Sequence, residues 1–120
     1  MHPRQFLEDR RSQFIESLAA YCRGDLTHQA AAGAAWDVIA SFEASGVESS
    51  VPYESGEDTF WAAVWALQHL ADDGHSASDS GKRDLRRYLA LLNADAPLPD
   101  GETGLRPSPP NNRLEPQRHE

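Results

Sequence analysis

The chain has 120 residues and a formal net charge of −8 at pH 7, and it contains a single cysteine. This length predicts one domain that folds without staples, and one cysteine excludes an internal disulfide. The charged N-terminus and the absence of an apolar run near the ~18 residues of a membrane span predict a cytoplasmic protein that carries no signal peptide and does not contact membranes.

The first predicted helix runs from about Pro3 to Arg23, with proline in the first turn, where its missing N–H would lack a partner anyway. Gly24 supplies a left-handed stop at its end. Apolar residues recur at helical spacing along this segment and predict its buried stripe. The stripe consists of Phe6, Leu7, Phe14, Ile15, Leu18 and Tyr21 or Cys22.

The second predicted helix begins after a cap at Thr27, continues to about Ser45 and stops at Gly46. Small side chains between Ala30 and Ala35 favour the close approach of a neighbouring helix. The predicted inward stripe is Ala31, Ala35, Val38, Ile39 and Phe42.

The third predicted helix begins at Ser55 and ends near Asp72, before Gly74. Ser55 and Asp58 match the capping box, and Glu57 and Asp58 lie at the positive end of the helix dipole. This segment is apolar around most of its circumference, so we expect it to be central. Its two apolar rows are Phe60, Val64 and Leu67, and Trp61 and Trp65.

The fourth predicted helix spans about Gly81 to Asn93 after a cap at Ser80. Its apolar row is Leu85, Tyr88, Leu89 and Leu92, and its outer face is Lys82, Arg83, Arg86 and Arg87. Residues 96–120 contain six prolines and few large apolar groups, which predicts a disordered tail. The sequence therefore predicts an all-α bundle of about four helices over residues 1–95, followed by a tail over 96–120.

From Asp25 to Ser80 the chain carries ten acidic residues and no lysine or arginine. Such a block creates a negative field that attracts basic partners and repels nucleic acid and anionic lipid. An ordinary solvated surface is the competing interpretation, although surfaces usually intersperse both signs of charge. The four cations of the last helix could contact phosphate, but a counterweight to the acidic block is the favoured interpretation because nucleic-acid binding usually needs a basic domain.

His69, Asp72, Asp73 and His75 have donor types that suit zinc or manganese. They form one local cluster without a second ligand-bearing helix, so a solvated helix end followed by a turn is the favoured interpretation. We therefore predict no metal and no other cofactor.

Cys22 could act as a nucleophile with His28 nearby, but it lies at the unfavourable C-terminal end of a helix, which favours a core cysteine. Trp61 and Trp65, one turn apart, could anchor a partner; the core is the favoured place for both, with one indole edge exposed.

The first helix junction reads Gly24-Asp25-Leu26-Thr27 after Ala20-Tyr21-Cys22-Arg23. It resembles the Gly-x-Leu/Ile-Ser/Thr connection in small, acidic, helical bacterial toxin-immunity proteins of the colicin D and contact-dependent inhibition type. The resemblance covers residues 14–92 as an architecture, but only this junction as sequence. The alanine-rich second helix and the long tail depart from the family. The resemblance implies inhibition of a basic nuclease toxin, and it transfers no site residue.

These observations predict a non-enzymatic protein that neutralises a basic protein partner, most concretely as an immunity protein. The predicted contacts are acids that flank the loops: Glu48, Glu54, Glu57, Asp58, Asp72 and Asp73. A helical adaptor or chaperone-like module that docks through the Trp61 and Trp65 region is the alternative. A small metal-dependent hydrolase at the histidine and aspartate cluster is a minor alternative.

Overall fold

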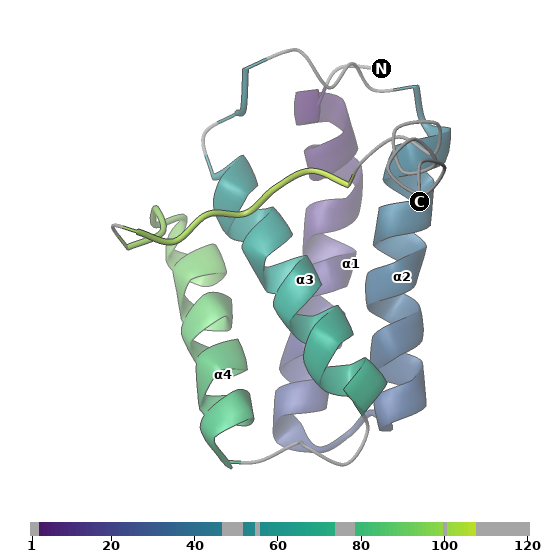
Figure 1. Cartoon of the computed structure of the whole chain (residues 1–120), viewed down its shortest axis with the longest axis vertical. Helices are drawn as coiled ribbons and strands as arrows, with labels where there is room; N and C mark the ends of the chain where they lie inside the picture. The colour runs from purple at the N-terminus through teal and green to yellow at the C-terminus, as the bar shows by residue number, and fades with distance from the viewer. Residues whose placement is uncertain (1–2, 47–51, 55, 74–78, 100, 108–120) are drawn as a thin grey trace, which may run out of the picture.

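Four helices make up the regular structure of the described residues, which are 3–46, 52–54, 56–73, 79–99 and 101–107 of the computed structural model. The helices are α1 (Pro3–Arg23), α2 (His28–Ala44), α3 (Glu57–Asp73) and α4 (Asp79–Ala94). Consecutive helices run in opposite directions, and α3 packs against the other three, most extensively against α2 (Figure 1). The predicted all-α bundle and the central place of α3 are confirmed.

The junction between α1 and α2 forms as the sequence predicts. Gly24 adopts a left-handed φ of +86°, and its N–H donates to the Tyr21 carbonyl over 3.0 Å. The Thr27 hydroxyl oxygen then accepts from the Ala30 N–H over 3.0 Å and caps α2. A glycine stop followed directly by a threonine cap therefore produces the tight reversal between the first two helices.

The starts of α3 and α4 each differ from the sequence prediction by two residues. Ser55 lies outside the described residues, and the reciprocal contact of a capping box occurs one residue earlier: the Glu57 carboxylate accepts from the Glu54 N–H over 2.9 Å. Because α4 begins at Asp79, Ser80 lies in its first turn and is not its cap. Local propensity places a helix end only to within about a turn, and tertiary contacts decide the rest.

An aromatic cluster fills the centre of the bundle. Phe42 and Phe60 each meet the Trp61 ring edge-on at a centroid distance of 5.0 Å, and Phe6 stacks on it at 6.0 Å. The predicted rows of α1 and α3 are buried around this cluster, with Phe14, Leu18, Val64 and Leu67 almost fully enclosed. The prediction that Trp61 is a core residue is thus confirmed.

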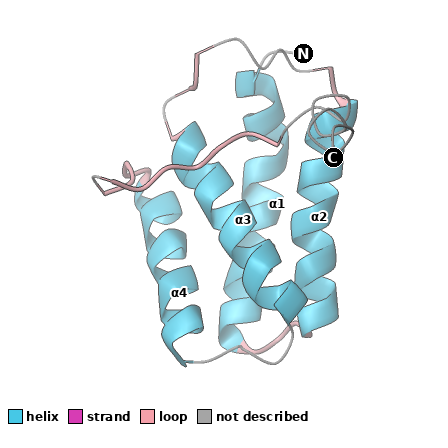
Figure 2. Ribbon diagram, in the orientation of Figure 1, coloured by secondary structure: helices cyan, strands magenta, loops and turns pink. Residues whose placement is uncertain are grey.

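The segment after α4 returns across the bundle, and we call residues 96–99 and 101–107 the strap. Figure 2 shows it crossing α3 as an irregular segment from the end of α4. The Thr59 hydroxyl donates to the Ala96 carbonyl over 3.2 Å, and Arg106 and Pro107 are buried. The predicted boundary after Asp95 is therefore wrong for the strap, because packing on α3 continues to Pro107. Residues 108–120 lie outside the described residues.

Candidate functional site

A buried ion pair attaches the strap to the N-terminal turn of α3. The Glu57 and Arg106 side chains are 1% and 4% exposed, and the guanidinium holds the carboxylate with two hydrogen bonds, Nε to Oε2 and Nη2 to Oε1, the second over 2.9 Å. The Glu57 carboxylate also accepts from the Trp61 indole over 3.1 Å and from the Glu54 N–H. The carboxylate is thus satisfied on both oxygens, as a buried charge must be. We call these contacts the polar anchor.

Tyr53 completes the polar anchor from the loop before α3. Its hydroxyl accepts from the Arg106 backbone N–H over 2.9 Å, and its ring lies 4.2 Å from the guanidinium carbon in a cation–π contact. Burial by itself raises the pKa of Glu57, but the hydrogen bonds from Arg106, Glu54 and Trp61 outweigh it and hold that pKa below its usual value. Glu57 is therefore ionised in the folded protein at neutral pH.

Two further contacts fix the strap beside the polar anchor. At Gly104 an added Cβ would lie 1.8 Å from the Asp58 carbonyl oxygen, so only glycine allows this approach to α3. The Trp65 indole donates to the Leu105 carbonyl over 2.7 Å. Because Gly104 and Arg106 face inward, the Leu105 side chain between them points outward and is 66% exposed.

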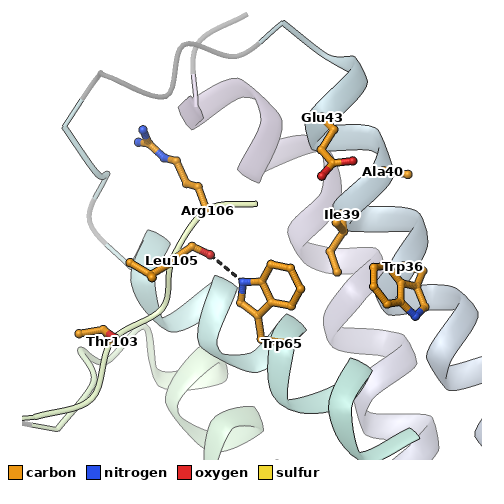
Figure 3. Close-up of a pocket in the computed structure, with 8 residues that line it drawn as sticks. All are labelled: Trp36, Ile39, Ala40, Glu43, Trp65, Thr103, Leu105 and Arg106. Carbon is orange, nitrogen blue, oxygen red and sulfur yellow. Dashed lines mark hydrogen bonds between the residues drawn. The ribbon is translucent and has the colours of Figure 1, made fainter. Parts of the chain in front are cut away.

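A groove lies between α2, α3 and the strap, with a volume of about 770 Å³. This volume is within the range of known ligand pockets. Figure 3 shows Trp36 on α2 and Trp65 on α3 at the groove, with the Arg106 side chain running away from both indoles. The lining residues are Trp36, Ile39, Ala40, Glu43, Trp65, Thr103, Leu105 and Arg106. Most of these side chains are apolar, and one of them, Trp36, is nevertheless 44% exposed to water.

The α2 wall of the groove was missed by the sequence prediction. Trp36, Ile39, Ala40 and Glu43 recur at i, i+3, i+4 and i+7, so they form one face of the helix. This face lies beside the inward stripe, with Ile39 common to both. A tryptophan outside the predicted core stripe, at the start of its own short apolar row, is the signal that could have identified this wall.

The charges of the two helices that form the groove have one sign. Together α2 and α3 carry six carboxylates and no lysine or arginine, whereas α1 and α4 together carry eight lysines or arginines and five carboxylates. Arg106 brings a cation to the groove, but Glu57 balances its charge. The groove therefore lies on the negative side of a molecule whose charges are separated between two pairs of helices.

The six acids predicted as partner contacts occupy different environments. Glu57 is buried in the polar anchor, so its prediction as a surface contact is wrong: its partner is Arg106 of the same chain. Glu54 and Asp58 are half-buried; Glu54 lies 3.4 Å from Arg4, and Asp58 accepts from the Thr59 N–H over 2.8 Å. Glu48 and the side chains of Asp72 and Asp73 lie outside the described residues.

The metal and nucleophile candidates gain no support from the described residues. His69 is exposed on α3, while His75 lies outside the described residues, as do the Asp72 and Asp73 side chains. Within the described part of the chain, no three potential metal ligands gather. Cys22 is half-buried beside the core, and burial raises the pKa of its thiol, which disfavours the thiolate.

The cationic face of α4 takes part in contacts within the chain. Arg87 pairs with Glu102 of the strap over 3.2 Å, and Lys82 lies 5.6 Å from the Tyr21 ring centre. Arg83 and Arg86 are exposed. Arg87 thus balances Glu102 of the strap. This acid lies outside the Asp25–Ser80 block, for which the sequence suggested the cations of this helix as a counterweight.

In the described parts of the chain, no helix has the length and apolar content that crossing a bilayer requires. Comparison with known proteins found no matching family model, no similar curated protein and no similar solved structure.

Proposed function

We propose that this chain is a non-enzymatic binding protein that neutralises a basic protein partner through its α2–α3 side. The separation of charge carries the proposal, because the two helices that form the groove carry no lysine or arginine and five carboxylates besides Glu57, whose charge Arg106 balances. A surface of one sign raises the local concentration of an oppositely charged partner and accelerates association. It also disfavours nucleic acid, whose phosphates carry the same sign.

We further propose that the partner is a nuclease-type toxin domain, so that the chain acts as an immunity protein. A nuclease must present cations to the phosphates of its substrate, and a surface rich in carboxylates can form ion pairs with those cations. The helical fold and the Gly24–Thr27 junction are compatible with this class of protein. The function requires no catalytic group on this chain.

A helical adaptor that docks through an aromatic patch is the second candidate. The half-buried Trp65 and the partly exposed Trp36 at one groove favour it, since tryptophan often contributes most at protein interfaces. The two candidates differ in salt dependence. Electrostatic association slows as salt rises, whereas docking driven by apolar contacts is much less affected.

Capture from the source cells with the full-length chain, followed by mass spectrometry, tests the proposal. We expect a basic protein, and we expect its association rate to fall steeply between low salt and 1 M salt, where the Debye length is about 3 Å. For a toxin, addition of the chain should also abolish its nuclease activity. An acidic partner, or a rate independent of salt, would contradict the proposal.

Two matched sets of substitutions locate the electrostatic surface. The test set is Glu54→Gln, Asp58→Asn, Asp72→Asn and Asp73→Asn, which leaves the buried Glu57 intact. The control set is Glu8→Gln, Asp9→Asn, Glu16→Gln and Asp84→Asn, all exposed on α1 and α4. Both sets remove four negative charges, so they change the net charge equally. We expect the test set to slow association at low salt about tenfold more than the control set.

A further inference from the structure

The strap leaves an apolar side chain in water between two buried residues. Leu105 is 66% exposed, while Gly104 before it and Arg106 after it are buried. The backbone at this point is held by the Trp65 indole and by the Tyr53 hydroxyl. Three consecutive residues are therefore fixed so that Leu105 stands at the edge of the groove, with its carbonyl turned toward Trp65 (Figure 3).

These contacts place an apolar site beside acidic helices. The aromatic walls come from two packed helices, so their backbone is already ordered before a ligand binds. Glu43 adds a carboxylate to the lining, and no lysine or arginine occurs on either helix. A ligand that combines an apolar side chain with neighbouring cations matches both the walls and the field.

We propose that this groove binds an apolar side chain of the basic protein partner, and that lysine or arginine flanks this side chain in the partner's sequence. This inference rests on the proposed function, and it adds where the partner binds and what its segment must contain. Contacts of this apolar side chain with Trp36, Trp65 and Leu105 contribute most of the affinity, while the flanking cations accelerate association and orient the partner. The strap is part of the site, since Leu105 and Thr103 form one wall.

Three synthetic peptides of equal length test the inference by fluorescence anisotropy with the full-length chain. One carries lysines around two leucines, the second replaces the leucines with serine, and the third replaces the lysines with glutamine. We expect the lysine–leucine peptide to bind tightest. Leu105→Ala and Trp36→Ala should each weaken it about tenfold or more, the loss typical of an interface hot spot.

Charge variants complete the design. Glu43→Gln, in the groove, should weaken the lysine–leucine peptide more than Glu16→Gln, on the exposed face of α1. Ala90→Ser, exposed on α4, should leave its affinity within about twofold and serves as the control for the apolar variants.

The outcomes separate the two proposals. Equal binding of both lysine peptides, unchanged by Leu105→Ala, would overturn the groove and leave the acidic surface standing. Equal binding of the leucine peptides with and without lysine would overturn the basic partner. Binding of none of the peptides would overturn the groove proposal. If the chain self-associates and Leu105→Ala abolishes this association, the groove binds a second copy of the chain. If truncation after Pro107 strongly increases the affinity for the lysine–leucine peptide, the groove is the binding site of residues 108–120.

Discussion

The two regions that the strap contacts differ in what they bury. At the polar anchor, two opposite charges are almost fully enclosed, and four hydrogen-bond donors reach the Glu57 carboxylate. At the groove, a few ångströms along the same segment, apolar side chains remain in contact with water. Adjacent residues of one chain, Leu105 and Arg106, thus have environments opposite to those that their chemistry prefers.

The difference separates stability from binding. A buried charge persists only because every partner is present, so the polar anchor is sensitive to any single deletion. Truncation of an exposed leucine lowers the stability of a protein only slightly, so the groove can serve a role other than folding. Substitutions on the two sides of the strap should accordingly give different results in stability and binding measurements.

The largest expected effect is at the polar anchor. Arg106→Ala leaves the buried Glu57 carboxylate without its cation and should lower the free energy of unfolding by about 3–5 kcal/mol. Urea denaturation followed by circular dichroism measures it. The double variant Glu57→Gln, Arg106→Met should lose clearly less free energy of unfolding than Glu57→Gln alone and Arg106→Met alone lose in sum. In the double variant the amide remains an acceptor, and no charge is left without a partner.

A free energy of unfolding of Arg106→Ala within about 0.5 kcal/mol of the wild-type value would contradict the prediction, since the polar anchor would then contribute little to stability.

A smaller effect is expected where the strap touches the α3 backbone. Gly104→Ala places a Cβ against the Asp58 carbonyl and the Ala62 N–H, which are backbone atoms that cannot rotate away. Such overpacking typically lowers the free energy of unfolding by about 1–3 kcal/mol. The matched control is Gly33→Ala, which meets no atom within 4 Å inside α2 and should stabilise by about 0.5–1 kcal/mol. Thermal melting of both variants checks the opposite signs.

Acid should weaken the polar anchor in a defined direction. Because the pKa of Glu57 is lowered on folding, its contribution is fully present above the unfolded value near 4.3 and is lost as pH falls through the lower folded value. Stability should therefore rise with pH across this window. Urea titrations at a series of pH values below 7 should give a steeper dependence for the wild type than for Glu57→Gln, and equal slopes would contradict the assigned pKa shift.

The fold was predictable because its signals are local. The glycine stop at Gly24, the cap at Thr27 and the apolar rows of α1 and α3 depend on residues a few positions apart. The pairing of Glu57 with Arg106 joins residues 49 positions apart, and no local pattern marks it. Prolines suggested that the whole segment after Asp95 lies apart from the bundle, whereas one arginine and one glycine attach its first part.

The site was less predictable than the fold for a related reason. Charge in the sequence identified the acidic side of the molecule, but it did not separate an acid that solvates the surface from one that is buried with a partner. Glu57 is the example, since its position in the first turn of a helix predicts exposure. The groove depends on two helices and the strap together, and only the Trp36 row on α2 was visible in the sequence.

The smallest expected effect on stability is at Leu105, and it carries the comparison furthest. Full burial of a leucine side chain contributes about 1.5–3 kcal/mol, and only about a third of Leu105 is covered. Leu105→Ala should thus lower the free energy of unfolding by at most about 1 kcal/mol. Leu92→Ala, at a position 2% exposed on α4, should lose about 2–5 kcal/mol by the same measurement. If Leu105→Ala is as destabilising as Leu92→Ala, Leu105 is a structural residue. A small loss of stability together with a tenfold loss of peptide affinity would place binding at the groove and leave the attachment of the strap to the polar anchor and the backbone contacts beside it.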